Sequence, residues 1–170
     1  GVGSLTLVDH DTITVTDINR QLYALQSTIG QKKVQIAKNR VHNIDENILV
    51  HTYETYYNEE TMELFDLRSY DYIVDAMDTV SSKILLIEQA GKSRVPVISC
   101  LNMWNRMNPS RLEIIDISRV ASDPEVKKMR TELRRKGIRK LKVLCSREHS
   151  HRGLEFRRNR ENAEKNTHGT

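Results

Sequence analysis

The chain has 170 residues, of which 38% are hydrophobic and 29% charged, with a formal net charge of +4 at pH 7 and a mean hydropathy of −0.58. A chain of this length can bury one substantial core, which favours one domain plus a tail. No apolar run approaches the ~18 residues of a membrane helix, and the start lacks the features of a signal peptide, so we expect neither a membrane-spanning nor a secreted protein. Because the first residue is Gly1 rather than Met, we expect a piece of a longer protein.

Short apolar runs alternate with amphipathic stretches along the chain. Compact or alternating apolar segments predict strands, and apolar residues at 3.6-residue spacing predict helices. In chain order we expect a strand over 5–8, a loop over 12–21, a helix that carries Val34, Ala37, Val41 and Ile44, a strand over 48–53, a short helix over 59–67, a strand over 72–74, a helix over 82–90, strands over 95–100 and 111–117, a helix over 124–136 and a strand over 138–144.

Local signals mark several element ends. Gly91 is a candidate C-cap for the helix before it. The Ser-Asp-Pro sequence at 122–124 predicts a helix start, because Asp caps free N–H groups and Pro loses nothing in the first turn. That helix should stop at Gly137. The polar and charged composition from Ser146 onward predicts a domain over 1–145 and a basic, weakly ordered tail over 146–170.

The alternation of strands and helices predicts a Rossmann-like α/β fold with a doubly wound, mostly parallel sheet and a basic C-terminal helix. Ligands in such sheets bind beyond the carboxyl ends of the strands. Asp9 and Asp11 follow the first predicted strand, and Asp75 and Asp78 follow the third. These four acids are therefore candidates for a binding site.

Asp9 has the position of a ribose-binding acid. Such an acid ends the second strand of a nucleotide-binding fold, whereas the alternative is an Asp that caps a turn. A glycine-rich phosphate loop should come roughly 20 residues earlier. Gly1-Val2-Gly3 directly precedes the strand and leaves no room for a helix. We therefore expect the first strand, the glycine-rich loop and the first helix to be absent from this chain.

Three further residues suit phosphate and metal binding. Arg20 can contact phosphate through two N–H groups, and Lys33 supplies a point charge close after Gly30. Asp78 could hold a magnesium ion, which binds few carboxylates and keeps waters and phosphate oxygens. The alternatives are a solvated lysine and an Asp that caps the following helix.

The charge is unevenly distributed. From Lys127 onward the chain has 15 basic and 5 acidic residues, whereas residues 1–126 have 12 basic and 18 acidic ones. A basic block on an acidic body suggests a polyanionic partner such as nucleic acid, although a solvated basic helix without a partner explains it equally well. The two cysteines, Cys100 and Cys145, show no metal-binding spacing, which predicts reduced thiols in a cytoplasmic protein.

Three segments together resemble one superfamily. LTLVDHDTITVTDINRQLYAL, GQKKVQIAKNR and DYIVDAMDTVSSK are similar to the ubiquitin-activating-like ThiF/MoeB/HesA superfamily. The later segment from ISCLNMWNRMNPSRLEIIDISRV to KVLCSRE resembles its tRNA threonylcarbamoyladenosine dehydratase (TcdA/CsdL) branch. The likeness is collinear from about Val2 to Glu148, so residues 1–145 would be a partial nucleotide-binding domain of this type.

The resemblance implies an enzyme that uses ATP and Mg²⁺ to adenylate the threonylcarbamoyl carboxylate on an anticodon-loop adenosine of tRNA. Loss of AMP then lets the group cyclise. The resemblance also implies a cytoplasmic homodimer in which a partner arginine completes the ATP site, and a possible sulfur-transfer partner protein. The residues that it assigns to ATP binding are Asp9, Asp11, Asn19, Arg20, Gln21, Lys33 and Asp78.

Each assigned role follows from the matching motif. Asp9 would hold the ribose, and Arg20 the phosphates, with its neighbours Asn19 and Gln21 shaping the phosphate pocket. Lys33 would stabilise charge on the α-phosphate, and Asp78 would hold magnesium. Arg20, Lys33 and Asp78 are thus the expected catalytic residues.

The sequence also departs from the family pattern. The glycine-rich loop is missing, Asn102-Met103-Trp104 replaces a small, glycine-containing stretch, and Asp17 stands where relatives commonly carry Asn. Without the backbone N–H groups of the loop, we expect this chain alone to be weakly active or inactive. Cys145 lies out of register with a cysteine of some relatives and is interpreted as a small buried hydrophobe.

Three other functions fit parts of the sequence. An adenylyltransferase for a ubiquitin-like sulfur-carrier protein fits the superfamily, although the zinc-binding CxxC pairs of many such enzymes are absent. A non-catalytic nucleic-acid-binding remnant would use the basic region over 127–160. An NAD-dependent dehydrogenase would leave Arg20 and Asp78 unexplained.

Overall fold

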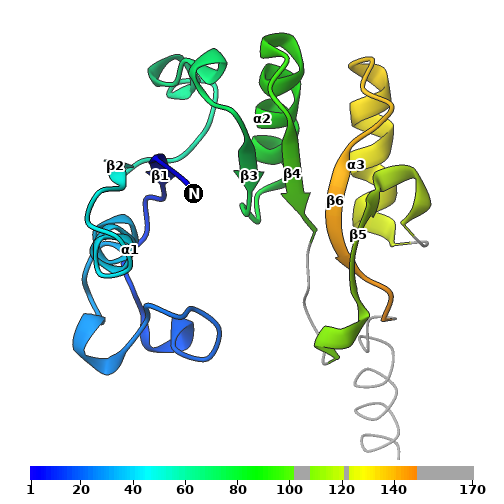
Figure 1. The fold of residues 1–170 in the computed structure, drawn as a ribbon. Coiled ribbons are helices and arrows are strands. Elements are labelled where there is room, and N and C mark those ends of the chain that lie inside the picture. The colour runs from blue at the N-terminus through cyan, green and yellow to red at the C-terminus, as the bar shows by residue number, and fades with distance from the viewer. Residues whose placement is uncertain (102–107, 121–122, 149–170) are drawn as a thin grey trace, which may run out of the picture. The chain divides into compact units, whose positions relative to one another are not determined.

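A computed structural model describes residues 1–101, 108–120 and 123–148 of the chain. The chain forms two compact units, Gly1–Phe65 and Asp66–Thr170 (Figure 1), which we call unit 1 and unit 2. Each unit has its own parallel strands and at least one helix. The α/β class with mostly parallel pairing is therefore confirmed. No helix in the described ranges is long and apolar enough to span a membrane.

Unit 1 is built on one β-α-β crossover. Strand β1 (Ser4–Val8) pairs in parallel with β2 (Leu49–Tyr53), and helix α1 (Lys33–His42) connects them. The alternating strand pattern places Val50 inside at 5% exposure, and the helical spacing does the same for Val34 at 2%. Both strands and the helix match the predicted segments to within a few residues.

The connection from β1 to α1 carries most of the candidate site residues. It contains one 3-10 turn at Val15–Asp17, inside the predicted loop over 12–21, and another at Gln26–Thr28, after that loop. A bridge between Thr12 and Lys32 closes this segment at its base. Gly30 has a φ of 82°, a left-handed conformation that glycine adopts without strain. The long connection therefore has a defined path.

The short helix predicted over 59–67 is wrong. The structure has two 3-10 turns there, Met62–Leu64 and Leu67–Ser69. Phe65, between them, is extended and 8% exposed, and the Asp66 carboxylate accepts the Arg68 N–H. Burial of the Phe65 ring and the local Asp66 cap thus outweigh the weak helical spacing of this segment.

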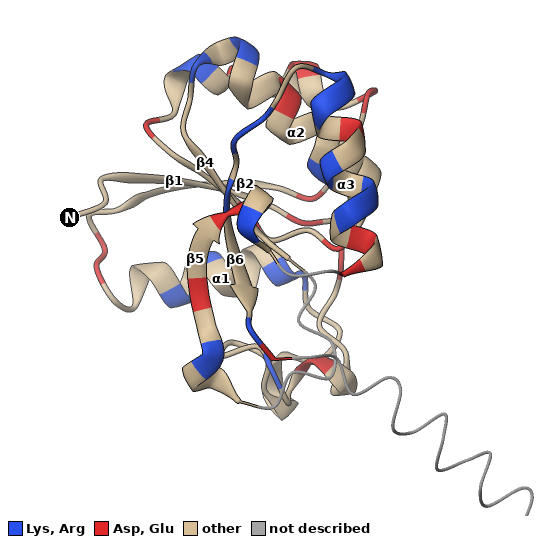
Figure 2. Cartoon of the chain, turned by 90° about the vertical axis from the view of Figure 1, so that its right-hand side faces the viewer, with Lys and Arg blue, Asp and Glu red and all other residues tan. Residues whose placement is uncertain are grey.

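Unit 2 contains a four-stranded sheet in the order β3-β4-β6-β5. Strands β3 (Ile73–Asp75), β4 (Val97–Cys100) and β6 (Lys142–Ser146) run parallel, and β5 (Leu112–Asp116) pairs antiparallel with β6 (Figure 1). Helices α2 (Val80–Ser93) and α3 (Pro124–Arg135) pack on one side of the sheet (Figure 2).

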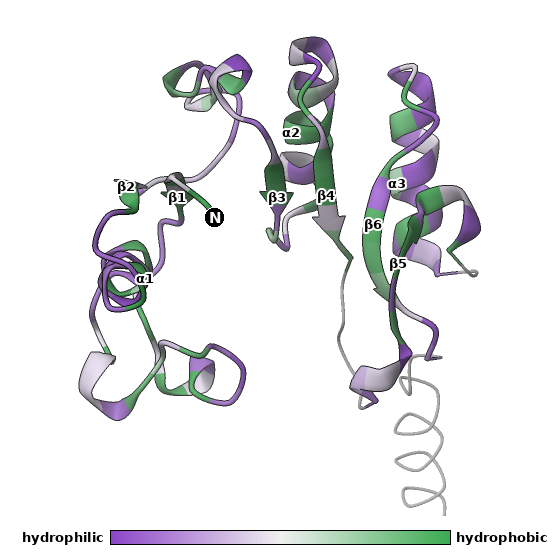
Figure 3. Ribbon diagram, viewed as in Figure 1, coloured by the Kyte–Doolittle hydropathy of each residue, from purple (hydrophilic) through white to green (hydrophobic). Residues whose placement is uncertain are grey.

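The core of unit 2 lies between this sheet and its two helices, where hydrophobic residues from strands and helices meet (Figure 3). Val143 of β6 is fully buried and Leu133 of α3 is 1% exposed. The buried members of this core are Ile87, Leu101, Ile117, Val126, Met129, Leu133, Leu141, Val143 and Cys145.

The helix signals of unit 2 have different outcomes. Asp123 caps α3 through the Glu125 and Val126 N–H groups, and Gly137 takes a φ of 80° after its end, as predicted. The Gly91 cap is wrong: α2 continues to Ser93, and Arg94 takes the left-handed conformation at φ 59°. Buried Ala90 keeps this last turn in place, so packing overrides the glycine signal.

The final strand begins later than predicted. Strand β6 starts at Lys142 rather than at residue 138, because Leu141 N–H is taken by the Asp116 carboxylate before the ladder with β4 and β5 begins. The predicted weakly ordered tail begins with residues 146–148, while its remainder, 149–170, lies outside the described residues, as do Asn102, Met103 and Trp104.

Candidate functional site

Asp9 lies directly after β1, at the carboxyl end of a parallel strand. Its N–H donates to the Tyr53 carbonyl at 3.1 Å, which extends the pairing with β2 by one residue. One carboxylate oxygen accepts the Asp11 N–H at 2.9 Å, and the other has no partner among the described residues. The side chain is half-buried. Asp9 thus forms a local turn and still offers an acceptor at the strand end.

Lys33 opens α1 and points back to the acids that follow β1. Its Nζ donates to Asp11 Oδ2 at 2.8 Å and lies 4.0 Å from Asp17 Oδ1. Lys33 is 7% exposed, so burial acts to lower its pKa, yet the hydrogen bond to Asp11 and the charges of Asp9, Asp11 and Asp17 raise that pKa above its usual value. The ammonium is therefore firmly protonated.

Asp17 is the buried acid that joins the two candidate phosphate-binding cations. Its carboxylate accepts the Thr14 N–H at 2.8 Å and the Arg20 Nη2 at 2.9 Å, and it is 3% exposed. The hydrogen bond from the Thr14 backbone is the largest cause that holds the pKa of Asp17 below its usual value. The sequence marked Asp17 only as a departure from the family pattern.

Arg20 is held on the 3-10 turn that contains Asp17. Its Nη1 also donates to the Thr16 carbonyl at 2.5 Å and to Asn19 Oδ1 at 3.3 Å. The Gln21 N–H bonds the Asp17 carbonyl at 2.9 Å, while Gln21 Oε1 is buried without a hydrogen-bond partner among the described residues. Arg20 and its two predicted neighbours thus belong to one local arrangement.

His10 is a further polar side chain at this strand end that sequence reasoning missed. Its ring stacks on Tyr56 with centroids 3.4 Å apart, and its Nε2 lies 2.8 Å from Asp11 Oδ1. Ligand atoms of Asp9, His10 and Asp11 lie within 4.8 Å of one another. Asp11 already bonds Lys33, whose charge opposes a cation there. We therefore describe this group as part of the Lys33 network.

Unit 2 has its own charged network at the carboxyl ends of β3 and β4. Asp75, 1% exposed, accepts two hydrogen bonds from Lys83 Nζ at 3.1 Å each and another from the Ser99 hydroxyl. Lys83 also donates to the Cys100 carbonyl at 2.7 Å, and the Met77 N–H donates to Asp75 at 3.0 Å. This network ties two strand ends to α2, and Lys83 and Ser99 were not predicted.

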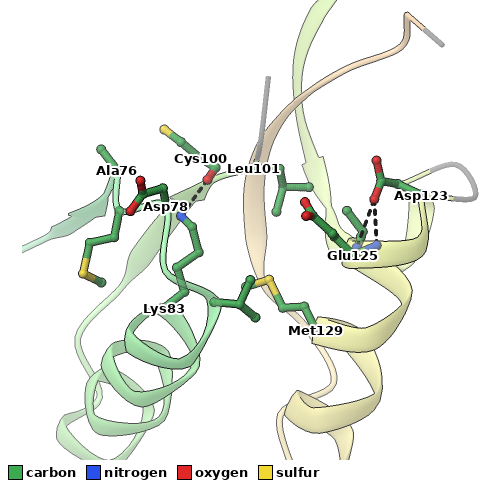
Figure 4. Close-up of a pocket in the computed structure, with 11 residues that line it drawn as sticks. Ala76, Asp78, Lys83, Cys100, Leu101, Asp123, Glu125 and Met129 are labelled. Carbon is green, nitrogen blue, oxygen red and sulfur yellow. Dashed lines mark hydrogen bonds between the residues drawn. The ribbon is translucent and has the colours of Figure 1, made fainter. Parts of the chain in front are cut away.

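Asp78 is exposed in the turn between β3 and α2. It accepts a weak hydrogen bond from Thr79 Oγ1 at 3.4 Å. The N-cap of α2 is Thr79, so the alternative interpretation of Asp78 as the helix cap is wrong. Asp78 lines a cavity of about 300 Å³ together with Lys83 and Cys100 on one side and residues of α3 on the other (Figure 4).

This cavity combines an apolar wall with charged groups. Leu101 and Met129 contribute apolar surface, and Asp123 and Glu125 lie at the start of α3 opposite Asp78 (Figure 4). Its position beyond the carboxyl ends of β3 and β4 is the one at which ligands bind in open α/β sheets.

The seven predicted site residues thus fall into both units. The structure brings Asp9, Asp11, Arg20 and Lys33 into one arrangement in unit 1, with Asp17 as the connecting acid. Asp78 belongs to the cavity of unit 2. Distant partners such as Lys83 and Ser99 gave no sequence signal, because they are linked to Asp75 only by the fold.

Comparisons with known proteins show which family and which fold the chain resembles. The model of the ThiF family matches residues 1–103. The chain is 43% identical over 140 residues to the tRNA threonylcarbamoyladenosine dehydratase of Bacillus subtilis, covering 82% of this chain and 55% of that protein. The Haemophilus influenzae enzyme of the same name is 36% identical over 135 residues, covering 79% and 52%.

The fold is also similar to a solved enzyme. The Escherichia coli tRNA N6-threonylcarbamoyladenosine dehydratase TcdA in complex with ATP superposes with a TM-score of 0.80 at 24% identity, over 87% of this chain and 64% of that one. The chain spans about half the length of the curated relatives it matches.

Proposed function

This chain belongs to the ThiF family, and from that premise we propose that it carries part of the ATP-binding domain of a tRNA threonylcarbamoyladenosine dehydratase. The proposed reaction adenylates the threonylcarbamoyl carboxylate, with AMP as the leaving group when the ring closes. The identity to the Bacillus subtilis enzyme over most of the chain supports this branch.

The observation that carries the proposal is the arrangement of Lys33 and Arg20 around Asp17. Both cations lie within 4.0 Å of one carboxylate oxygen, so they can reach a single bound anion. Phosphate transfer chemistry needs cations placed on the phosphates, and Arg20 has an exposed guanidinium for this contact. Asp9, at the strand end, offers the free carboxylate oxygen that a ribose hydroxyl needs.

The acids and cations of unit 1 suit ATP, and Asp78 of unit 2 suits a magnesium ion. Asp9 would hold the ribose, Arg20 and Lys33 the phosphates, and Asn19 and Gln21 would line the phosphate pocket. Asp11 would orient Lys33. Asp78 is exposed and does not cap α2, so its carboxylate suits a magnesium ion, which accepts one or two carboxylates. When bound, the metal would neutralise phosphate charge.

The partners of the reaction are part of the same proposal. We propose tRNA as substrate, a homodimer, and a cytoplasmic location; the exposed lysines and arginines on α3 support a polyanionic partner (Figure 2). The sulfur-transfer partner rests on the resemblance alone.

Calorimetric titration of residues 1–170 with ATP and Mg²⁺ tests the site. We expect Lys33→Met to weaken ATP binding about tenfold or more, because an ammonium on the phosphates is lost. Lys38→Met, which removes the same charge from the same helix, is the control and should bind as the unaltered chain does. Equal ATP affinity of Lys33→Met and Lys38→Met would contradict the proposed role of Lys33.

A further inference from the structure

Unit 2 has a second hollow, at the other end of its parallel strands. It has a volume of about 710 Å³ and lies where β4 and β6 begin and where the antiparallel β5 ends. Asp75 and Cys100 are the last residues of β3 and β4, and Asp78 lies in the turn after β3, so all three are at the opposite, carboxyl end of the parallel strands. Figure 1 shows the direction of these strands. The hollow is thus separate from the cavity that Asp78 lines.

Three cations line this hollow without an ion-pair partner in the described part of the chain: Arg119, Lys140 and Lys142. All three are exposed. The acid among the lining residues, Asp116, accepts the Ser118 N–H at 2.9 Å and the Leu141 N–H at 3.2 Å. Asp116 keeps its negative charge, so three cations against one carboxylate leave the lining with a net positive charge.

An aromatic ring lies beside these charges. Tyr72, just before β3, is 43% exposed, and Lys142 Nζ lies 5.7 Å from the centre of its ring. Ile114, 59% exposed, and Pro96 add apolar surface to the same hollow. Cations that follow a phosphate backbone and an aromatic face that stacks on a base are the two elements of single-stranded nucleic-acid recognition.

We propose that this hollow binds a single-stranded segment of RNA. Arg119, Lys140 and Lys142 contact phosphates, and one base stacks on Tyr72. An acidic peptide would match the charge but would leave the ring without a planar partner, so the combination favours RNA. That the RNA is tRNA rests on the proposed function; that the hollow binds single-stranded RNA does not.

Fluorescence anisotropy with a labelled RNA hairpin that has an anticodon-sized loop, measured without ATP over a series of salt concentrations, tests the proposal. We expect Lys140→Gln/Lys142→Gln to weaken binding about tenfold at low salt and to reduce the salt slope by about 1.4, at roughly 0.7 per single-strand phosphate contact. Arg119→Gln, outside the strands, should reduce the slope by about half as much.

Tyr72→Ala separates stacking from charge. It should weaken binding about fivefold while leaving the salt slope unchanged, since a stacked base contributes without releasing counterions. The matched charge control is Arg40→Gln/Arg68→Gln, two exposed residues outside the hollow. A blunt RNA duplex of equal length should bind more weakly than the hairpin.

The outcomes named next would overturn the proposal that this hollow binds single-stranded RNA. It fails if the chain binds no RNA, if the hollow variants bind as the control does, or if Lys128→Gln/Arg134→Gln on α3 alone abolishes binding. Equal competition by a polyglutamate peptide would identify a general anion surface instead. The RNA assay contains no ATP, so loss of RNA binding by the hollow variants and loss of ATP binding by Lys33→Met are separate results.

Discussion

Lys33 of unit 1 and Lys83 of unit 2 are both buried lysines near the carboxyl ends of parallel strands, but their partners differ. Lys33 is 7% exposed and bonds Asp11, whose side chain is 46% exposed. Lys83 is 5% exposed and bonds Asp75, which is 1% exposed and also receives Ser99 and Met77 donors.

This difference indicates two roles for the same residue type. The Lys83 ammonium has three acceptor contacts, and Asp75 accepts further donors, so replacing either Lys83 or Asp75 leaves a buried charge uncompensated. Asp17, which is buried, also lies 4.0 Å from Lys33, but Asp11 can turn to water at little cost. In the proposed site, Lys33 would exchange the Asp11 carboxylate for a phosphate oxygen. If the proposed site is correct, the exposure of the partner, rather than that of the lysine, distinguishes a structural pair from a binding pair.

The largest expected effect tests whether the Lys83–Asp75 pair is structural. Lys83→Met should lower the free energy of unfolding by about 3–5 kcal/mol, because Asp75 is left buried and charged. Urea denaturation monitored by circular dichroism measures this loss. Lys92→Met removes an exposed lysine from the same helix and should change the free energy by less than about 1 kcal/mol.

A rescue variant makes this test specific. Adding Asp75→Asn to Lys83→Met should recover part of the lost stability, since the uncompensated charge is removed. If Lys83→Met is no less stable than Lys92→Met, the buried network does not hold unit 2 together.

An intermediate effect tests the proposed binding role of the charged residues in unit 1. Asp17→Asn keeps an oxygen acceptor for Thr14 but removes the charge that competes with phosphate for Arg20 and Lys33. We expect ATP to bind about threefold more tightly, as one charge in a partly solvated site allows, at a cost of about 1–2 kcal/mol in stability. Unchanged or weaker ATP binding would show that Asp17 does not compete with the nucleotide.

The same variant has a predicted pH dependence. Because the folded pKa of Asp17 lies below its unfolded value of about 3.9, its charge contributes stability above roughly pH 4 that is lost as the pH falls through the folded pKa. Asp17→Asn should therefore lose less stability than the unaltered chain as the pH falls below about 4, measured by thermal unfolding.

The smallest effect concerns a buried polar group outside both networks. Tyr57 is 7% exposed, its hydroxyl has no hydrogen-bond partner among the described residues, and burial followed by the charge of Glu63 raises its pKa to about 12. Tyr57→Phe should leave the free energy of unfolding unchanged or raise it by up to about 1 kcal/mol, because no bond is lost and no unsatisfied hydroxyl stays buried.

Alkaline unfolding provides the second readout. The folded pKa is raised, so the contribution of Tyr57 is present below about pH 10 and is lost as the pH rises toward 12. Tyr57→Phe should flatten this loss, whereas Tyr56→Phe, at a residue 56% exposed, should not. Destabilisation by Tyr57→Phe at neutral pH would reveal a hydrogen bond that the hydroxyl needs.

The sequence by itself determined the features that depend on residues close together in the chain. Asp123 and Pro124 set the start of α3, the short apolar runs set the parallel strands, and Asp9 was placed at a strand end. Capping, side-chain alternation and strand-end position act within one or two turns of chain, so a single sequence records them. Two separate segments predicted Arg20 and Lys33 as candidate cations, and the structure places both near the Asp17 carboxylate.

Contacts between groups that are distant in the chain could be seen only in the tertiary structure. Ser99 reaches Asp75 across 24 positions, and Lys33 reaches Asp11 across 22. Packing also replaced the expected helix over 59–67 with 3-10 turns and moved the left-handed cap of α2 to Arg94. Burial and partner choice depend on what the fold places within a few ångströms, which local propensity does not encode.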